Sequence, residues 1–527
     1  MVCIPIAGRT SQTLHARACD NMKRYRNVFT IGMVSSMSVK AEDQSAGKDN
    51  LNRQALVAGS FFVFVQLLVR GITFLTTPIY TRLVSTQQYG DIRVYESWLL
   101  IAVPIMSLCT YRSVPKAKFE FPGRFNQYVS SALTLAYLTT LAMFAIITLF
   151  FREWFMEFTD MDTLMYVYML LYVLACTALY FFQNREMQLM RYQRSTLVTG
   201  ITMVSATLLS IALLYWGNVS GHQDDLVQLR VIGFYTPQII GGVIVTLLMM
   251  GAGRCAYNSD YWKYAISYSV PFIPDVLSIQ IMNQSDKIMM QKMIGGDATG
   301  LFSLATTVSF ITWILEDAVW TAWRPWLFEK LARDEADDVE RPWMNLVVLF
   351  CLLAWVLIMM GPEIVLVLGG EKYHESVYLI APMITGTLYR FFSYAFSAVQ
   401  SFENKTKYVA LGTIIVMVTN VVLNFICIQL VGYQAAAYTT CASYFLLLVV
   451  QGVLEMRVTG RRIVSLRKMC LLSAGIFVLN VVSMVSYGWV WYARYVVMLA
   501  VGIASLRFVL PIAKGLLAQL KTKSAGA

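Results

Sequence analysis

Residues 408–454 read YVALGTIIVMVTNVVLNFICIQLVGYQAAAYTTCASYFLLLVVQGVL and contain no Asp, Glu, Lys or Arg. A helix of about 20 apolar residues crosses the hydrocarbon core of a bilayer, so this stretch is too long for a single crossing. Gly432, in the sequence Leu-Val-Gly-Tyr, is the natural position for a turn. The stretch therefore predicts two consecutive transmembrane helices.

The composition extends this prediction to the whole chain. The 527 residues are 57% apolar and 14% charged, and their mean hydropathy is +0.58. Soluble domains carry roughly 25% charged residues, so this composition excludes a soluble globular protein, a disordered chain and a disulfide-bonded secreted module. We predict an all-α polytopic membrane protein with about fourteen transmembrane helices. The expected spans are 54–77, 92–111, 128–150, 163–183, 196–216, 231–251, 263–284, 300–323, 343–361, 377–400, 408–429, 434–454, 469–488 and 494–513.

The loops explain the net charge of +11, because cytoplasmic loops of membrane proteins are enriched in Lys and Arg. Basic clusters follow alternate spans, as in 112–124, 324–341 and 457–468, whereas the intervening loops hold one or two basic residues, among them Arg230 and Lys287. The alternation predicts an even number of spans and cytoplasmic termini. No basic run has interleaved aromatic residues, so we expect no nucleic-acid partner.

Cysteine and histidine are too scattered to build a site. None of the 9 cysteines forms a C-x-x-C pair and the 3 histidines lie far apart, so we expect neither a metal site nor a disulfide framework. The phosphate-binding loop G-x-x-x-x-G-K-[ST] does not occur, and we expect no cofactor. Residues 1–50 are polar and lack the apolar core of a signal peptide, and we expect them to be a disordered extension or the product of a start codon assigned too early.

The chain contains a weak internal repeat. Shifted by 210 positions, Gly90 falls on Gly300, and each glycine leads into an apolar stretch after a short loop. Two halves in the same orientation imply a pseudo-two-fold axis along the membrane normal, with the substrate bound between them; chance similarity between apolar segments is the alternative. The expected parts are an N-terminal lobe of about six helices at 51–255, a C-terminal lobe of about six helices at 256–460, and two extra helices with a tail at 461–527.

Several ionisable residues lie within the expected spans. A charge at the bilayer centre costs about 2.5–3.5 kcal/mol on insertion scales. These side chains should therefore face one another, the bundle interior or a water-filled cavity. They are Arg70, Glu96, Asp275, Glu316, Asp317 and Arg390.

The chemistry of these residues suggests a transport site. A guanidinium binds phosphate through a planar fork of donors, so Arg70 and Arg390 are the candidates for binding an anionic substrate. A buried carboxylate can take up a proton or Na⁺ reversibly, which makes Asp275, Glu316 and Asp317 the candidates for ion coupling. For each residue the alternative is an intramembrane ion pair that only stabilises helix packing.

Three segments carry recognisable patterns: 77–90 (TPIYTRLVSTQQYG), 285–305 (SDKIMMQKMIGGDATGLFSLA) and 404–437, which begins with Asn-Lys-Thr-Lys. Together they resemble the bacterial polysaccharide or oligosaccharide flippases of the multidrug/oligosaccharidyl-lipid/polysaccharide exporter (MOP) superfamily. In the second segment Lys287 stands where the family usually has arginine, and Phe302 stands where it usually has tyrosine.

The resemblance implies two six-helix lobes around a central cavity in a protein of the bacterial inner membrane. The cargo would be an undecaprenyl-pyrophosphate-linked oligosaccharide, moved from the cytoplasmic to the outer leaflet for O-antigen, capsule or exopolysaccharide synthesis. Family members commonly line the cavity with cationic residues that accept the pyrophosphate and any acidic sugars, and Arg70 and Arg390 are the candidates for this role by their position in the spans, without a match to an invariant family position. The implied partners are this cargo, membrane lipids, H⁺ or Na⁺, a polysaccharide polymerase and a chain-length regulator, and the protein would be a transporter, not an enzyme.

Four alternatives stay open. A lipid II flippase or a drug/cation antiporter would belong to the same superfamily. A membrane-embedded polysaccharide polymerase or glycosyltransferase would be expected to carry a large outer loop with clustered catalytic side chains. A membrane scaffold that transports nothing would not need charges within its spans.

Overall fold

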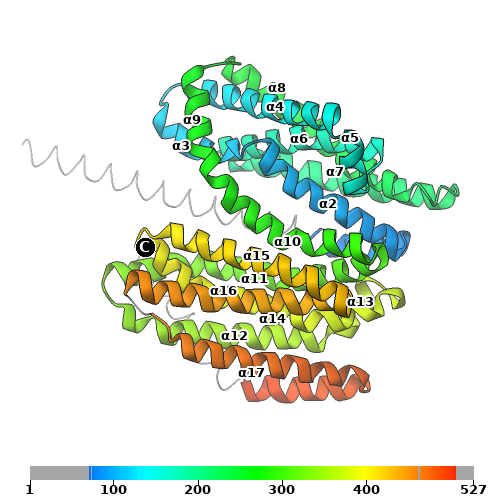
Figure 1. Ribbon diagram of the computed structural model, residues 1–527, viewed down its shortest axis with the longest axis vertical. Coiled ribbons are helices and arrows are strands. Elements are labelled where there is room, and N and C mark those ends of the chain that lie inside the picture. Colours follow the sequence, from blue (N-terminus) through cyan, green and yellow to red (C-terminus); the bar gives the residue numbers. More distant parts are fainter. Residues whose placement is uncertain (1–70, 73, 461–462, 506–527) are drawn as a thin grey trace, which may run out of the picture. The chain divides into compact units, whose positions relative to one another are not determined.

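The computed structural model describes residues 71–72, 74–460 and 463–505, and within these ranges the chain is helical and has no β-strand (Figure 1). The first helix is described from residue 71 to 83, without residue 73. The longer helices are α2 (Thr86–Met106), α4 (Phe125–Phe150), α6 (Thr163–Gln188), α7 (Tyr192–Val219), α8 (Leu226–Gly253), α9 (Ser259–Ser269), α10 (Ile273–Met293), α11 (Gly296–Ala332), α12 (Glu340–Met359), α14 (Val377–Phe402), α15 (Thr406–Val431), α16 (Ala435–Thr459) and α17 (Leu466–Val485). The shorter ones are η1 (Thr110–Ser113), α3 (Val114–Glu120), α5 (Arg152–Thr159), η2 (Val270–Phe272), η3 (Ala336–Asp338), α13 (Gly361–Leu368), η4 (Glu371–Ser376) and η5 (Ser486–Gly488).

The prediction of a polytopic all-α membrane protein is confirmed. Ten of the described helices are long and apolar enough to cross a membrane, or eleven if α2 and the bent segment after it form one span. All the expected spans except the first and the last coincide with described helices. The turn predicted at Gly432 is also present, since α15 ends at Val431 and Gly432 adopts the left-handed φ of +95° that glycine tolerates.

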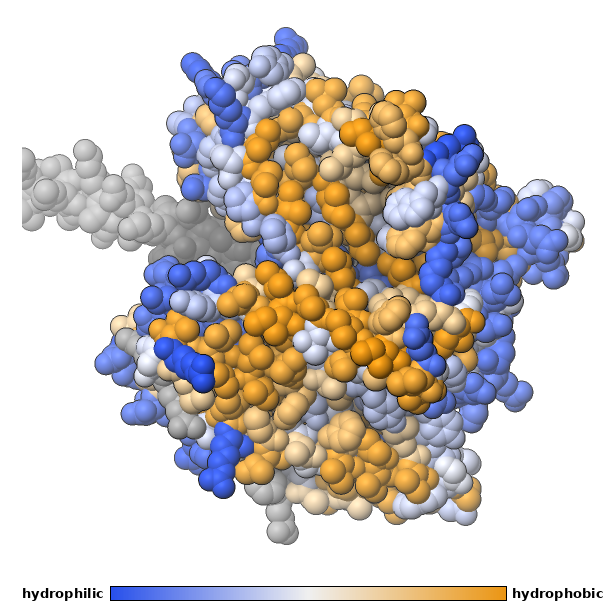
Figure 2. Space-filling view, in the orientation of Figure 1, coloured by the Kyte–Doolittle hydropathy of each residue, from blue (hydrophilic) through white to orange (hydrophobic). Residues whose placement is uncertain are grey.

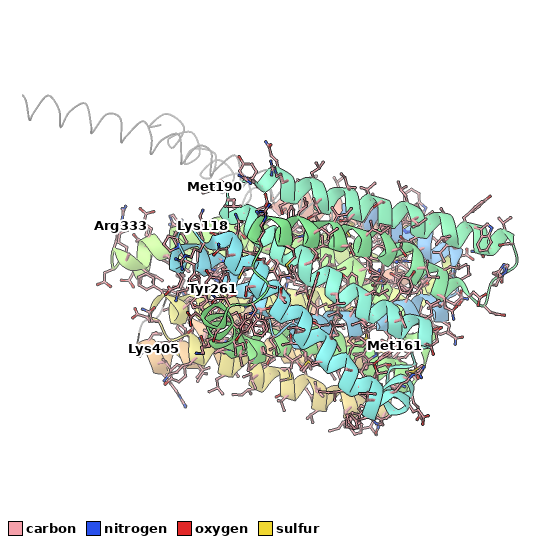
Figure 3. The ribbon with its side chains drawn as sticks, turned by 90° about the horizontal axis from the view of Figure 1, so that it is seen from above. Lys118, Met161, Met190, Tyr261, Arg333 and Lys405 are labelled. Carbon is pink, nitrogen blue, oxygen red and sulfur yellow. The ribbon has the colours of Figure 1, made fainter. Side chains whose placement is uncertain are left out.

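The helix ends form two polar surfaces. Figure 3 shows Lys118, Arg333 and Lys405 at one end of the bundle and Met161 at the other. We call the first the basic end and the second the opposite end. Apolar side chains cover the middle of the face shown in Figure 2, with hydrophilic residues toward the helix ends. This distribution is that of a protein whose mid-section contacts lipid.

The helices pack in two groups, each with its own core. In the N-terminal half, α4, α6, α7 and α8 pack together with α2. In the C-terminal half, α11, α12, α15, α16 and α17 surround α14, which is buried along most of its length. Helix α10 contacts α2 of the first group and both α11 and α15 of the second.

Two sequence expectations about helix boundaries are wrong. Arg230 and Lys287 were expected in loops, but they lie inside α8 and α10 respectively. Arg230 is buried and Lys287 is half-buried. Both helices continue through residues that are too polar for an apolar window, because neighbouring helices supply hydrogen-bond partners and opposite charges.

Helix α9 packs on the N-terminal half, although residues from 256 onward were assigned to the C-terminal lobe. Its Tyr261 contacts Phe121 and Tyr128, with ring centroids 4.8 and 5.6 Å apart. The chain then passes through η2, with Pro271 and Pro274 flanking the break, into α10. Proline removes a helical hydrogen bond, so we propose that the halves meet at this break.

Helices α2 and α11 make a very close contact at the opposite end. A Cβ atom added to Gly90 would lie 2.1 Å from the Gly296 carbonyl oxygen, and one added to Gly300 would lie 2.2 Å from the Thr86 carbonyl oxygen. Only residues without a side chain allow this approach. Under the shift of 210 positions, Thr86 corresponds to Gly296 and Gly90 to Gly300, so the contact is reciprocal, as a two-fold axis between the halves requires.

Polar contacts also hold the two halves together at this end. Ser85 and Gln88 form a capping box that begins α2 beside the glycines. The Gln291 amide donates to Asp91 at 2.7 Å, and Lys292 Nζ lies 2.6 Å from Asp160. Lys372 Nζ donates to the Val84 carbonyl oxygen at 2.6 Å. The two halves are therefore held together at the opposite end by both packing and hydrogen bonds.

We predict that Gly90→Ala destabilises the protein, because its methyl group must push α2 away from the Gly296 carbonyl. Overpacking of this kind costs about 1–3 kcal/mol. Gly200→Ala is the matched control, since Gly200 lies inside α7 with nothing within 4 Å of an added Cβ, and it should be neutral or stabilising by up to about 1 kcal/mol. Thermal unfolding in detergent measures both. Equal melting temperatures for the two variants would contradict the prediction.

Candidate functional site

A central cavity of about 600 Å³ lies beside α10, α11, α14 and α16. Its wall also includes Gly71 and Phe74 of the first helix and Arg93 of α2, so both halves contribute. Aromatic and apolar side chains such as Phe310 and Trp313 share the wall with amides and hydroxyls. A mostly apolar wall with a few polar groups is typical of ligand-binding cavities.

The charged side chains on this wall are mainly cationic. Arg93, Lys287 and Arg390 line the cavity, and Asp286 is the acidic residue among the described lining residues. Lys287 Nζ donates to Gln284 Oε1 at 3.2 Å, and the same oxygen accepts from Ser97 of α2 at 2.9 Å. The wall therefore favours an anionic ligand.

Arg390 is held in place by a buried carboxylate and two aromatic rings. Its Nη2 atom lies 2.8 Å from Glu316 Oε2, and the Glu316 side chain is fully buried. The guanidinium carbon lies 4.7 Å from the centroid of the Trp313 ring and 5.8 Å from that of Tyr444. Arg390 Nε has no hydrogen-bond partner among the described residues. The guanidinium thus has one donor committed to Glu316, and its Nε atom is buried against the surrounding side chains.

Asp286 lies in a polar network that joins three helices. Its carboxylate accepts from the Asn424 amide of α15 and, at 2.8 Å, from the Thr440 hydroxyl of α16. The Asn424 amide oxygen in turn accepts from the Thr439 hydroxyl. Asp286 and Asn424 are both buried. A buried carboxylate among amide and hydroxyl groups has the oxygen-rich surroundings that hard cations prefer.

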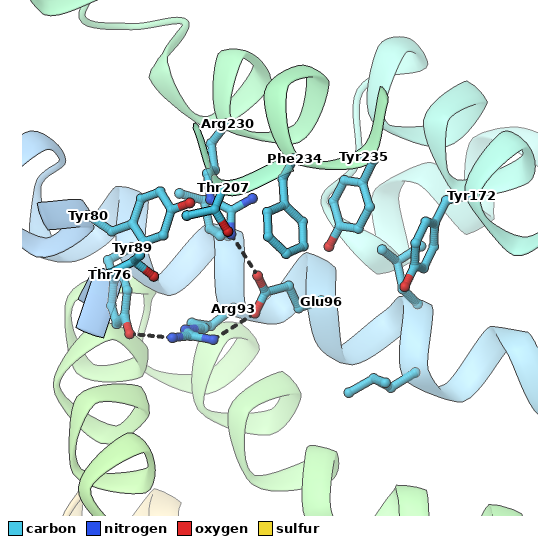
Figure 4. Close-up of a pocket in the computed structure, with 13 residues that line it drawn as sticks. Thr76, Tyr80, Tyr89, Arg93, Glu96, Tyr172, Thr207, Arg230, Phe234 and Tyr235 are labelled. Carbon is cyan, nitrogen blue, oxygen red and sulfur yellow. Dashed lines mark hydrogen bonds and ion pairs between the residues drawn. The ribbon is translucent and has the colours of Figure 1, made fainter. Parts of the chain in front are cut away.

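A second charged cluster lies in the N-terminal half (Figure 4). Glu96 of α2 lies between two arginines, with Oε2 2.8 Å from Arg93 Nη1 and Oε1 3.4 Å from Arg230 Nη2. Arg93 Nη2 also donates to the Tyr89 hydroxyl at 2.7 Å. These residues line a smaller cavity of about 210 Å³. Since Arg93 lines both cavities, the two clusters adjoin.

The candidate residues from the sequence fall in different places. Arg70 lies outside the described residues, although its neighbour Gly71 lines the central cavity. Arg390 and Glu316 come together as an ion pair. Asp275 is half-buried in the first turn of α10, and Asp317 is half-buried beside Glu316 in α11. Neither of these two aspartates lines the central cavity.

Sequence reasoning missed Arg93, Arg230, Asp286 and Lys287 as site residues. The expected span 263–284 ends before Asp286 and Lys287, because the polar run Asn-Gln-Ser-Asp-Lys at 283–287 resembles a loop, and the span 231–251 begins just after Arg230. Arg93 lies inside the span 92–111 and was not recognised as a site residue. The available signal was the absence of Gly and Pro from this run, which is compatible with a continuous helix.

We predict that the pair Arg390–Glu316 is strongly coupled in stability. Arg390→Gln leaves a fully buried carboxylate without its partner, which costs up to about 3–5 kcal/mol. Glu316→Gln should cost less, because the arginine it releases faces the cavity. The double variant should be more stable than Arg390→Gln alone. Melting temperatures of the four proteins in detergent test this, and losses that simply add would contradict it.

Comparison with known proteins gives a consistent classification. The family model described as "Polysaccharide biosynthesis protein" matches residues 56–331. An uncharacterized membrane protein of Haemophilus influenzae is 22% identical over 347 residues, which cover 62% of this chain and 80% of the relative. The family match bears out the resemblance that the sequence segments suggested.

Two groups of solved structures share the fold. The lipid II flippase MurJ, in an inward closed conformation, has a TM-score of 0.60 at 12% identity and covers 87% of this chain and 99% of its own. An inward-facing multidrug resistance MATE family transporter of the MOP superfamily has a TM-score of 0.53 at 11% identity, covering 77% of this chain and 99% of its own. Because the family model spans more than half of the sequence, the chain belongs to the polysaccharide biosynthesis protein family, and it has the fold of MOP-superfamily transporters.

Proposed function

We propose that this protein moves an undecaprenyl-pyrophosphate-linked oligosaccharide from the cytoplasmic to the outer leaflet of the bacterial plasma membrane. The observation that carries the proposal is the central cavity, where three cationic side chains face one carboxylate on a wall shared by both halves. Membership of the polysaccharide biosynthesis family supports a glycan cargo. Two solved proteins that share the fold are a flippase and a transporter, not enzymes.

The pyrophosphate would bind to the cations of the central cavity. Arg390 lines the cavity and is held in a fixed orientation by Glu316, so we propose that its guanidinium offers donors to phosphate oxygens. Lys287 supplies a mobile point charge from α10, and Arg93 approaches from α2. Arg70, which precedes Gly71 in the sequence, is proposed as a further ligand. Cations from both halves would bind the pyrophosphate until the halves separate.

The direction of access follows from the closed end. The glycine contact brings α2 and α11 close together at the opposite end, so we propose that cargo enters from the basic end. We propose that the basic end faces the cytoplasm, where Lys and Arg are enriched, and that both termini lie there. Delivered cargo would then pass to a polymerase and a chain-length regulator on the outer face.

The cavity cations should control export. Arg390→Gln removes a charge-assisted contact of about 1.5–3 kcal/mol, so cargo binding should weaken by about 10–100-fold, with partial rescue in Arg390→Lys, which lacks the fork. Complementation of a strain without its own flippase, with protein abundance in the membrane as the control, measures this. Arg333→Gln is the matched variant, because Arg333 pairs with Glu329 on the exposed basic end. Normal export by a well-expressed Arg70→Ala, Arg390→Ala double variant would contradict the role of these arginines.

We further propose that transport is coupled to H⁺ or Na⁺ through a buried carboxylate. Asp275, Glu316 and Asp317 are candidates from the sequence. Asp286 is added to them because its hydrogen-bond partners are a neutral amide and a neutral hydroxyl, and among the described residues it makes no ion pair. Glu316 is already paired with Arg390. A carboxylate with neutral neighbours gains most from taking up a cation.

Flipping in vesicles under imposed proton or sodium gradients tests the coupling. Asp286→Asn should abolish the gradient dependence, whereas Asp275→Asn, outside the cavity wall, should retain it. Glu316→Gln and Asp317→Asn complete the set. If Asp286→Asn keeps the dependence and another variant loses it, the coupling role belongs to that other carboxylate.

A further inference from the structure

Two exposed basic side chains lie over aromatic rings where the chain bends after α2 and where it passes from α9 into α10. The guanidinium carbon of Arg112, in η1, lies 5.6 Å from the centroid of the Phe272 ring in η2. Lys116 Nζ, in α3, lies 5.3 Å from the centroid of the Tyr268 ring in α9. The two rings are neighbours, with centroids 5.5 Å apart. We call these four residues the cation–aromatic cluster.

The two cations of this cluster are not neutralised by the described part of the protein. Both side chains are exposed, and within the described residues neither forms an ion pair or a side-chain hydrogen bond. Lys118, by contrast, donates to the Gln188 carbonyl oxygen. An aromatic face stabilises a cation but leaves its charge in place. The cluster therefore presents two positive charges to an external anion.

Exposed apolar side chains lie on the same segments as these charges. They are Phe119 of α3, Ile266 of α9 and Val270 of η2. Helix α9 also contains one tryptophan and three tyrosines, and Figure 3 places its Tyr261 toward the basic end. Because Trp and Tyr rings of membrane proteins lie at the level of the lipid headgroups, cations held over such rings should lie at the depth of the lipid phosphates.

We infer that the cation–aromatic cluster binds the headgroup phosphate of a monoanionic phospholipid such as phosphatidylglycerol. Basic segments beside a membrane attract anionic headgroups, and the exposed apolar side chains fit the upper part of the acyl chains. The assignment to the cytoplasmic leaflet rests on the proposed function, in which the basic end faces the cytoplasm. Binding of the phospholipid itself does not depend on transport.

A phospholipid fits this surface better than the pyrophosphate of the cargo or a soluble phosphate. Arg112 and Lys116 belong to the wall of neither cavity, so they are not part of the site proposed for the cargo. A soluble phosphate would leave the apolar side chains exposed, whereas a phospholipid covers them. Charge and apolar surface together therefore favour a bilayer lipid.

The bound lipid would join two bent segments of the chain. The helical segment 110–120 is bent by 58° relative to α2, and η2 is the break between α9 and α10. Helix α9 packs directly against η1. A headgroup that contacts Arg112 and Lys116 over the rings of η2 and α9 would hold these segments together. Anionic lipid should therefore stabilise the folded protein.

Titration of the detergent-purified full chain with palmitoyl-oleoyl-phosphatidylglycerol and with the corresponding phosphatidylcholine, measured by native mass spectrometry, tests the inference. Wild-type protein should bind the first phosphatidylglycerol more tightly than phosphatidylcholine. The double variant Arg112→Gln, Lys116→Gln should weaken this binding by about 25-fold, or about fivefold for each cation. Arg191→Gln, Arg194→Gln is the matched control, because it removes the same charge from two exposed residues of the same half, and it should bind as wild type does.

Two further variants separate charge from geometry. Arg112→Lys, Lys116→Arg keeps both charges and should keep phosphatidylglycerol binding close to the wild-type level. Tyr268→Leu, Phe272→Leu removes the rings that position the cations and should weaken binding by about fivefold. Unchanged melting temperatures in phosphatidylcholine control for folding. Phosphatidylglycerol should raise the melting temperature of wild type and of the matched control, but not that of Arg112→Gln, Lys116→Gln.

The inference is overturned if phosphatidylglycerol binds no more tightly than phosphatidylcholine. Equal losses in the two glutamine double variants also overturn it, because the lipid would then respond to net charge alone. Undecaprenyl pyrophosphate or inorganic phosphate that requires Arg112 and Lys116, when phosphatidylglycerol does not, would assign the surface to the cargo or to a soluble anion instead. The proposed function is tested separately, since vesicles without flipping would contradict transport and leave the measured phospholipid binding unchanged.

Discussion

The close approach of α2 and α11 is the constraint on which the rest of the structure depends. The Gly90–Gly296 and Gly300–Thr86 contacts bring two backbones together without side chains between them, and small residues of this kind are what allow membrane helices to associate closely. Because the contact lies at one end, it fixes how far apart the same helices can be at mid-membrane. The central cavity occupies the space that results, and Arg93, one turn beyond Gly90 on α2, reaches its wall.

The second constraint is the cost of charge in a membrane. Near the cavities, Arg390 is neutralised by Glu316, and Arg93 and Arg230 share the carboxylate of Glu96. Lys287 donates a hydrogen bond to a neutral amide oxygen. If every buried cation were paired with a carboxylate, these ion pairs would hold the helices in one arrangement. The cavities instead hold more cations than carboxylates. This surplus positive charge can attract an anionic cargo, which the site must bind and then release.

The sequence was informative where a single physical quantity decides the structure. Apolar length located the spans, and the turn at Gly432 followed because the uncharged run 408–454 is too long for a single crossing of the bilayer. The shift of 210 positions pairs Gly90 with Gly300, and both glycines lie in the contact between α2 and α11. Partners across helices were not accessible in the same way, because Glu316 and Arg390 are far apart in the chain and only packing brings them within 2.8 Å. The polar run at 283–287 was misread for a related reason, since its partners Asn424 and Thr440 lie on other helices.

The position of Asp286 and Lys287 on α10 has a mechanical consequence. Consecutive residues of an α-helix point about 100° apart around its axis, and here Asp286 bonds to α15 and α16 while Lys287 bonds within α10 beside α2. A rotation of α10 that draws one charge toward its neighbours necessarily carries the other away. The contacts of the two side chains are therefore linked through α10. A rotation that improves the contacts of Asp286 with the C-terminal half weakens those of Lys287 beside α2, and the reverse rotation has the opposite effect.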